Sequence, residues 1–221
     1  MKILGIDEAG RGPVCGPLVL CGYLIDEKNV SQLRELGVKD SKLLTAEKRQ
    51  QLAPLLKKLS DDFITLKIKA DEIDSSDNLN KLEIEKMQHI INALSPDAVI
   101  IDSPEVNTAA FSKKVLSKLK NKNIKIISEN YADKKYHEVG AASIIAKVER
   151  DKEISKLHKQ HGCFGSGYTH DEITIRFLKD WIKKNKEFPN FVRKSWSTAQ
   201  RLLEEKEQSN MKRFVVKSRD A

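Results

Sequence analysis

The order of strand-like and helix-like segments limits the folds open to this chain. The run at 18–25 is apolar without interruption, which is typical of a strand buried on both faces. Shorter apolar or alternating runs predict four more strands, at 2–7, 63–70, 98–102 and 124–128. Apolar residues at helical spacing predict helices at 45–59, where Thr45 is the expected N-cap, and at 79–94, 109–121, 140–160, 173–184 and 197–207.

Strands come first in this order, and helices then alternate with strands. The order predicts an α/β fold with a mixed five-stranded sheet, in which helical crossovers join the parallel strands. The chain has 221 residues, which is enough for one sizeable core or for one domain with a small appendage.

The composition indicates the kind of binding partner and the cellular compartment. The formal net charge of +8 favours a polyanionic partner such as nucleic acid, although a charged surface also serves simple solubility. Three cysteines do not make a disulfide framework and indicate a reducing compartment. The sequence has no apolar run of the roughly 20 residues that a membrane helix needs and no signal-peptide features, so we expect a cytoplasmic protein.

Acidic residues follow the ends of three predicted strands. Asp7 ends the first strand with Glu8 beside it, Asp102 ends the fourth, and Asp133 comes just after the fifth. Ligands of open α/β sheets bind beyond the carboxyl ends of the parallel strands, so Asp7 and Asp102 face each other if their strands are neighbours. Each acid taken alone is also a common turn or cap residue.

Crowded carboxylates repel one another unless a cation neutralises them. Oxygen ligands suit Mg²⁺ or Mn²⁺ better than Zn²⁺. Two such ions about 4 Å apart activate a water molecule and stabilise a leaving oxygen in phosphodiester hydrolysis. The acids therefore indicate metal-assisted phosphoryl transfer, a class that contains many enzymes.

Four motifs narrow this class. They are GIDEAGRGPVCGPLV at 5–19, KDSKLLT at 39–45, IDS at 101–103 and AASIIAKVERD at 141–151. With these motifs the chain resembles the type 2 ribonuclease H family, ribonuclease HII, from residue 2 to about 200. The segment FVRKSWST at 191–198 resembles the single-chain archaeal branch of that family. The resemblance implies a ribonuclease H-like fold with a C-terminal helical segment.

The resemblance also implies an activity. It implies an endonuclease that hydrolyses the RNA strand of RNA–DNA hybrids and cleaves on the 5′ side of single ribonucleotides in duplex DNA, leaving 5′-phosphate and 3′-hydroxyl ends. Such an enzyme removes ribonucleotides and RNA primers, and we expect it to be a monomer. The implied cofactor is Mn²⁺ or Mg²⁺. The implied catalytic and metal-binding acids are Asp7, Glu8, Asp102 and Asp133, with Glu138 as the alternative to Asp133.

Substrate-binding residues follow from the same resemblance. Gly10, Arg11 and Gly12 would grip the ribonucleotide through backbone groups and sense its 2′-hydroxyl, because glycine permits a close approach. Tyr168 would pack on the next sugar and so recognise the RNA-to-DNA junction. The residues alone also fit an ordinary turn and a half-buried tyrosine. The resemblance implies phosphate contacts for Lys39, Ser41, Lys42, Ser143 and Lys147. For the lysines, a solvated surface is the alternative explanation.

The C-terminal part carries further expectations. We predict a catalytic domain at 1–170, a helical segment at 171–207 that packs on it, and a flexible basic tail at 208–221. Basic and aromatic residues of this part are expected along the duplex backbone: Lys183, Lys184, Lys186, Arg193, Lys194 and Trp196.

The spacing of residues in the tail segment QSNMKRFV, at 208–215, suggests a separate binding motif. It follows the pattern of sliding-clamp binding peptides, except that Val215 departs from the usual second aromatic residue. A basic tail without a partner is the alternative. The residues that carry the pattern are Gln208, Met211, Phe214 and Val215.

Three rival functions remain at this point. A junction resolvase or exonuclease of the same fold would not need the Gly-Arg-Gly segment or Tyr168. A non-catalytic binder of hybrids would not need all four acids. A nuclease with histidine as its general base would stay active in the presence of a chelator.

Overall fold

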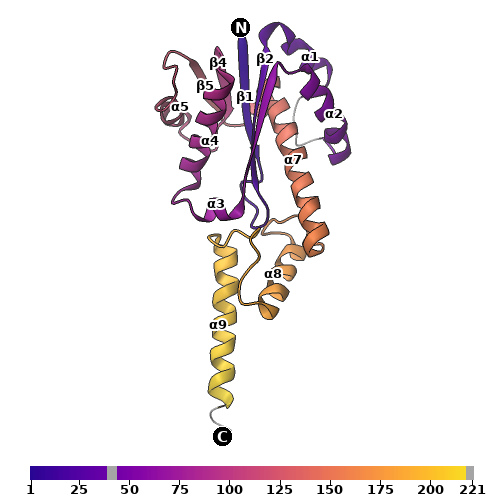
Figure 1. Ribbon diagram of the computed structural model, residues 1–221, viewed down its shortest axis with the longest axis vertical. Coiled ribbons are helices and arrows are strands. Elements are labelled where there is room, and N and C mark those ends of the chain that lie inside the picture. Colours follow the sequence, from indigo (N-terminus) through magenta and orange to yellow (C-terminus); the bar gives the residue numbers. More distant parts are fainter. Residues whose placement is uncertain (39–43, 218–221) are drawn as a thin grey trace. The chain divides into compact units, whose positions relative to one another are not determined.

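The computed structural model describes residues 1–38 and 44–217, without the side chains of 209–217. The chain forms two compact units (Figure 1). The first comprises Met1–Arg11, Leu18–Ile68 and Ser76–Lys152, and the second comprises Gly12–Pro17, Lys69–Ser75 and Glu153–Ala221. The predicted boundaries at residues 170 and 207 stay a prediction.

The first unit contains a five-stranded sheet with β1 at its centre. Its strand order is β3-β2-β1-β4-β5. β1 pairs antiparallel with β2 and parallel with β4, and β4 pairs parallel with β5. The prediction of a mixed five-stranded sheet is therefore confirmed. The strands are β1 Lys2–Ala9, β2 Leu18–Asp26, β3 Asp62–Ile68, β4 Ala98–Asp102 and β5 Lys125–Glu129.

Helices cover both faces of this sheet (Figure 1). On one face α1 (Val30–Glu35), α2 (Ala46–Leu59) and the part of α7 (His137–His161) that belongs to this unit bury apolar residues against β1 and β2. On the other face α4 (Leu79–Leu94) and α5 (Thr108–Leu116) pack on the strands. The shorter η1 (Glu27–Asn29) and α6 (Ala132–Lys135) follow β2 and β5, and they were not expected from the sequence.

Successive side chains of β1 point to opposite faces of the sheet, as the period of a strand requires. Gly5 lies against the α7 backbone, where an added Cβ would come within 2.6 Å of the Val139 nitrogen. Leu4 points the other way, toward the face that α4 covers. By the same alternation Asp7 faces the α7 layer and Glu8 faces the α4 layer.

The second unit has its own apolar core. It contains α3 (Ala70–Asp74), α8 (Glu172–Lys184), α9 (Ser197–Lys217) and the last part of α7. Phe164 and Phe191 stack at its centre with ring centroids 5.0 Å apart. α9 continues past residue 207, where the predicted helix ends, to Lys217. No helix within the described residues is long and apolar enough to span a membrane.

Candidate active site

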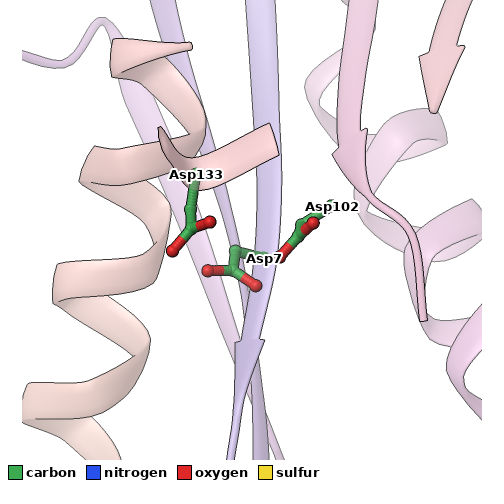
Figure 2. Close-up of side chains that lie close together, drawn as sticks. All are labelled: Asp7, Asp102 and Asp133. Atoms are coloured by element: carbon green, nitrogen blue, oxygen red, sulfur yellow. The ribbon is translucent and has the colours of Figure 1, made fainter. Parts of the chain in front are cut away.

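Three carboxylates meet at the carboxyl edge of the central strands. β1 and β4 are parallel neighbours in a register that pairs Ile6 with Ile101, so Asp7 and Asp102 follow at the same edge. Asp133 comes from α6, which begins after Tyr131 reverses the chain in a left-handed conformation (φ 61°). Oxygens of the three acids all lie within 4.8 Å of one another. Figure 2 shows the side chains pointing toward a common centre.

Hydrogen bonds hold the cluster in place. The Asp102 Oδ1 accepts from the Ala132 amide at 3.0 Å, which ties α6 to the end of β4. The Asp7 Oδ1 accepts from the Glu8 amide at 2.7 Å. Asp133, and not its alternative Glu138, joins the two strand-end acids, whereas the backbone of Glu138 packs against Gly5.

The acid cluster is largely buried, so negative charge on it is energetically unfavourable. Asp7 is 4% exposed and Asp133 2%. Burial raises the pKa of Asp7 from 3.8 to about 7, Lys147 opposes this rise, and the neighbouring Asp102 adds to it. The Ser143 hydroxyl, which hydrogen-bonds to Asp7, also lowers the pKa. An arrangement of this kind stabilises a bound cation, because the cation removes the cost of several buried negative charges.

Glu8 lies on the opposite face of β1 and is not a member of the three-acid group. Burial raises its pKa well above the ordinary value, with Asp7 and Glu83 adding to the rise and Arg11 opposing it. Its Oε2 is buried and has no hydrogen-bond donor among the residues that the structure describes. The donor set consists of carboxylate oxygens, which fits Mg²⁺ or Mn²⁺ and not a thiolate-preferring ion.

Ser143 and Lys147 lie side by side on α7, one turn apart. The Lys147 ammonium donates to the Ser143 hydroxyl, and both residues influence the Asp7 carboxyl. Their predicted phosphate contacts stay a prediction. Three further residues with predicted phosphate contacts lie outside the described residues: Lys39, Ser41 and Lys42.

The Gly-Arg-Gly segment begins directly after β1. Gly10 has a φ of +84°, which an L side chain rarely adopts. The Arg11 Nε donates to both Glu83 carboxylate oxygens, at 3.1 and 3.2 Å, and its Nη2 donates to Asn80. Sequence reasoning missed Glu83 and Asn80. The available signal was an acid on the apolar stripe of the 79–94 helix, since Glu83 is four residues from both Leu79 and Met87.

The second unit contains Gly12 and Tyr168. A Cβ at Gly12 would lie 4.0 Å from the Tyr168 ring, so the two residues are neighbours. The Gly167 carbonyl accepts from the Val14 amide at 2.8 Å, and the Trp196 indole donates to the Gly12 carbonyl at 3.1 Å. These contacts hold the 12–14 segment between the Tyr168 loop and the 191–198 motif.

The prediction that Arg193 contacts the duplex is wrong. Its side chain is fully buried and donates to the Gly16 carbonyl from Nε at 3.1 Å and from Nη2 at 3.0 Å. The guanidinium also lies 4.8 Å from the centre of the Trp196 ring. A cation enclosed in this way stabilises the turn at Gly16 and is not exposed to a phosphate.

The sheet order and the buried acid cluster together define a class: metal-dependent nucleases with a ribonuclease H-like fold. Within that class, the sequence model of the family described as Ribonuclease HII matches residues 4–199, and the chain belongs to this family. The prediction of a metal-dependent endoribonuclease of the ribonuclease H type is thereby confirmed.

Individual relatives agree with the family. The chain is 45% identical to the ribonuclease HII of Thermococcus onnurineus over 216 residues, which covers 96% of this chain and 94% of the relative. The crystal structure of ribonuclease H2 from Pyrococcus horikoshii matches with a TM-score of 0.89 at 44% identity, over 93% of this chain and 98% of that one. The ribonuclease HII in a complex with PCNA from Archaeoglobus fulgidus matches with a TM-score of 0.82 at 38% identity, over 89% and 96%. The similarity to the archaeal branch is confirmed.

Proposed function

We propose that this chain cleaves duplex DNA on the 5′ side of single embedded ribonucleotides and also hydrolyses the RNA strand of longer hybrids. The observation that carries the proposal is the convergence of Asp7, Asp102 and Asp133 within 4.8 Å at the end of the central strands. Glu8, beside Asp7 and with a buried oxygen that lacks a donor among the described residues, would complete the set.

The acids would hold two Mg²⁺ or Mn²⁺ ions, which when bound supply activation of water and stabilisation of the leaving oxygen. The sheet register joins β1 to β4, and the Asp102–Ala132 hydrogen bond joins α6 to the end of β4, which supports a site that would be in place for the ions before the substrate binds. Lys147 partly offsets the negative charge at Asp7. The products would carry 5′-phosphate and 3′-hydroxyl ends.

Recognition of ribose would come from the Gly-Arg-Gly segment and Tyr168. The positive φ of Gly10 presents backbone groups without a Cβ, which permits contact with a 2′-hydroxyl. The neighbouring Gly12 and Tyr168 support a shared role at the RNA-to-DNA junction.

The test uses a DNA duplex with one ribonucleotide and an identical all-DNA duplex. We expect one cut, on the 5′ side of the ribonucleotide, that requires Mg²⁺ or Mn²⁺ and disappears in Asp7→Asn. Asp77→Asn, a matched change of an exposed aspartate, should cut normally. Cutting of the all-DNA duplex would contradict ribose recognition, and activity in a chelator would favour the histidine-based rival.

We also propose that the segment 208–215 binds a sliding clamp. The support is its residue spacing together with the similarity to the Archaeoglobus fulgidus ribonuclease HII, whose structure is that of a complex with PCNA. A peptide of residues 208–221 titrated with the clamp should bind, and Phe214→Ala should abolish binding. Absence of binding at high micromolar concentration would refute the proposal.

A further inference from the structure

Glu83 is a buried acid that the proposed chemistry does not use. It lies on α4 with its side chain fully enclosed, while its partner Arg11 is 31% exposed. The Arg11 Nε–H points between the two carboxylate oxygens, at 3.1 and 3.2 Å. An ion pair with one fully buried member is costly to break, because the remaining charge loses its compensation.

A second residue of α4 holds the same guanidinium. Asn80, one turn before Glu83, accepts from the Arg11 Nη2. The Asn80 amide in turn donates to Glu105 at 3.3 Å, and Glu105 accepts from Lys114 at 2.8 Å. Helix α4 and the loop that follows β4 therefore fix the direction of the Arg11 side chain. We call Glu83 and Asn80 the Arg11 anchor.

The anchor determines which groups the Gly10–Arg11 turn can offer to a substrate. The Arg11 guanidinium bonds to α4 through its Nε and Nη2, so its side chain is committed to the protein at these two nitrogens. Gly10, one residue earlier, is in a left-handed conformation with a φ of +84°. The turn is thus fixed from one side by the sheet, where β1 ends at Ala9, and from the other by the anchor.

We propose that Glu83, with Asn80, is a positioning residue for ribose recognition: it holds Arg11 and thereby fixes the Gly10–Arg11 backbone against the 2′-hydroxyl. This inference rests on the proposed function, since it assigns the alignment of that backbone to α4. Glu83 acts through Arg11 and does not itself contact the reacting atoms.

The first experiment compares Glu83→Gln with the matched control Glu85→Gln. Glu85 lies two residues further along α4, and its side chain is 45% exposed. On a duplex with one ribonucleotide, we expect Glu83→Gln to lower kcat about 10²-fold, the size expected for a misalignment near 1 Å, while KM changes much less. Glu85→Gln should behave as wild type. A folded Glu83→Gln enzyme with the wild-type kcat would overturn the inference.

The second experiment separates positioning from stability. Arg11→Met combined with Glu83→Leu replaces the ion pair by apolar side chains, a change that often preserves stability. We expect a melting temperature near that of wild type and a kcat as low as that of either single variant, because both remove one and the same contact. A wild-type kcat in this double variant, or losses that multiply, would refute the positioning role.

Two further measurements keep the outcome unambiguous. Should Glu83→Gln not fold, the half-buried Asn80 offers Asn80→Ala, for which we expect a smaller loss of kcat in the same direction; a wild-type kcat there would count against the anchor. The wild-type enzyme is assayed beside it on the all-DNA duplex. Equal cutting of both duplexes by wild type means that the proposed function fails, whereas normal discrimination by wild type together with a wild-type kcat of Glu83→Gln on the ribonucleotide duplex means that only the inference fails.

Discussion

Asp7 should make the metal-free protein less stable as the pH rises. Burial raises its pKa from 3.8 to about 7, so between these values the folded state binds a proton that the unfolded state has released. Stability then falls by about 1.4 kcal/mol per pH unit across that window. Between pH 5 and pH 8, the free energy of unfolding changes only over the roughly two pH units from 5 to about 7. The expected loss of stability is therefore about 3 kcal/mol.

Asp7→Asn removes this titration and keeps the shape of the side chain. Urea unfolding in a chelator at pH 5 and pH 8 gives the free energy of unfolding for both proteins, and the difference between them cancels the titrating groups that do not interact with Asp7. We expect Asp7→Asn to gain about 3 kcal/mol relative to wild type between the two pH values. Mg²⁺ at about 100 times its Kd should then stabilise wild type by about 2.7 kcal/mol and the variant less. An equal pH dependence in both proteins would refute the reasoning.

Three other substitutions test neighbouring features. Gly5→Ala should lower the free energy of unfolding by about 2–3 kcal/mol in urea, because its Cβ would lie 2.6 Å from the Val139 nitrogen. Lys147→Met removes a cation that opposes protonation of Asp7, so the acidic limb of a pH–rate profile should move to higher pH. Burial raises the pKa of Glu149, but hydrogen bonds from two lysines outweigh it and lower the pKa to about 2. Glu149→Gln should therefore flatten the loss of stability as the pH falls from about 5 to 2, measured by unfolding at each pH.

The placement of Asp7 and Asp102 could be predicted because strand ends are visible in the sequence. Each acid follows a short apolar run, and a parallel pair brings its carboxyl ends to one edge. Thr45 was likewise predictable as an N-cap, and its hydroxyl accepts from the Lys48 amide. Asp133 was harder to predict, because it lies on α6 and not at a strand end, and α6 begins after Tyr131, a non-glycine residue in a left-handed conformation.

The buried charged side chains could not be predicted from the sequence. Arg193 occurs in a basic segment and resembles a phosphate contact, yet its guanidinium bonds to the carbonyl of Gly16, 177 positions away. Glu83 looks like one of many charged helix residues until Arg11, 72 positions earlier, is seen beside it. A buried charge needs a partner, and distant partners become visible only when the chain is folded.

The two adjacent acids of β1 connect the site to both helix layers. Because side chains of a strand alternate, Asp7 meets Ser143 and Lys147 of α7, while Glu8 lies near Glu83 of α4. The end of β1 therefore contacts both helix layers: α7 lies beside the acid cluster, and α4 lies beside the turn at Arg11. Changes in α7 should consequently act on cleavage through the pKa of Asp7, whereas changes at the Arg11 anchor should act through the alignment of Arg11 and through the pKa of Glu8.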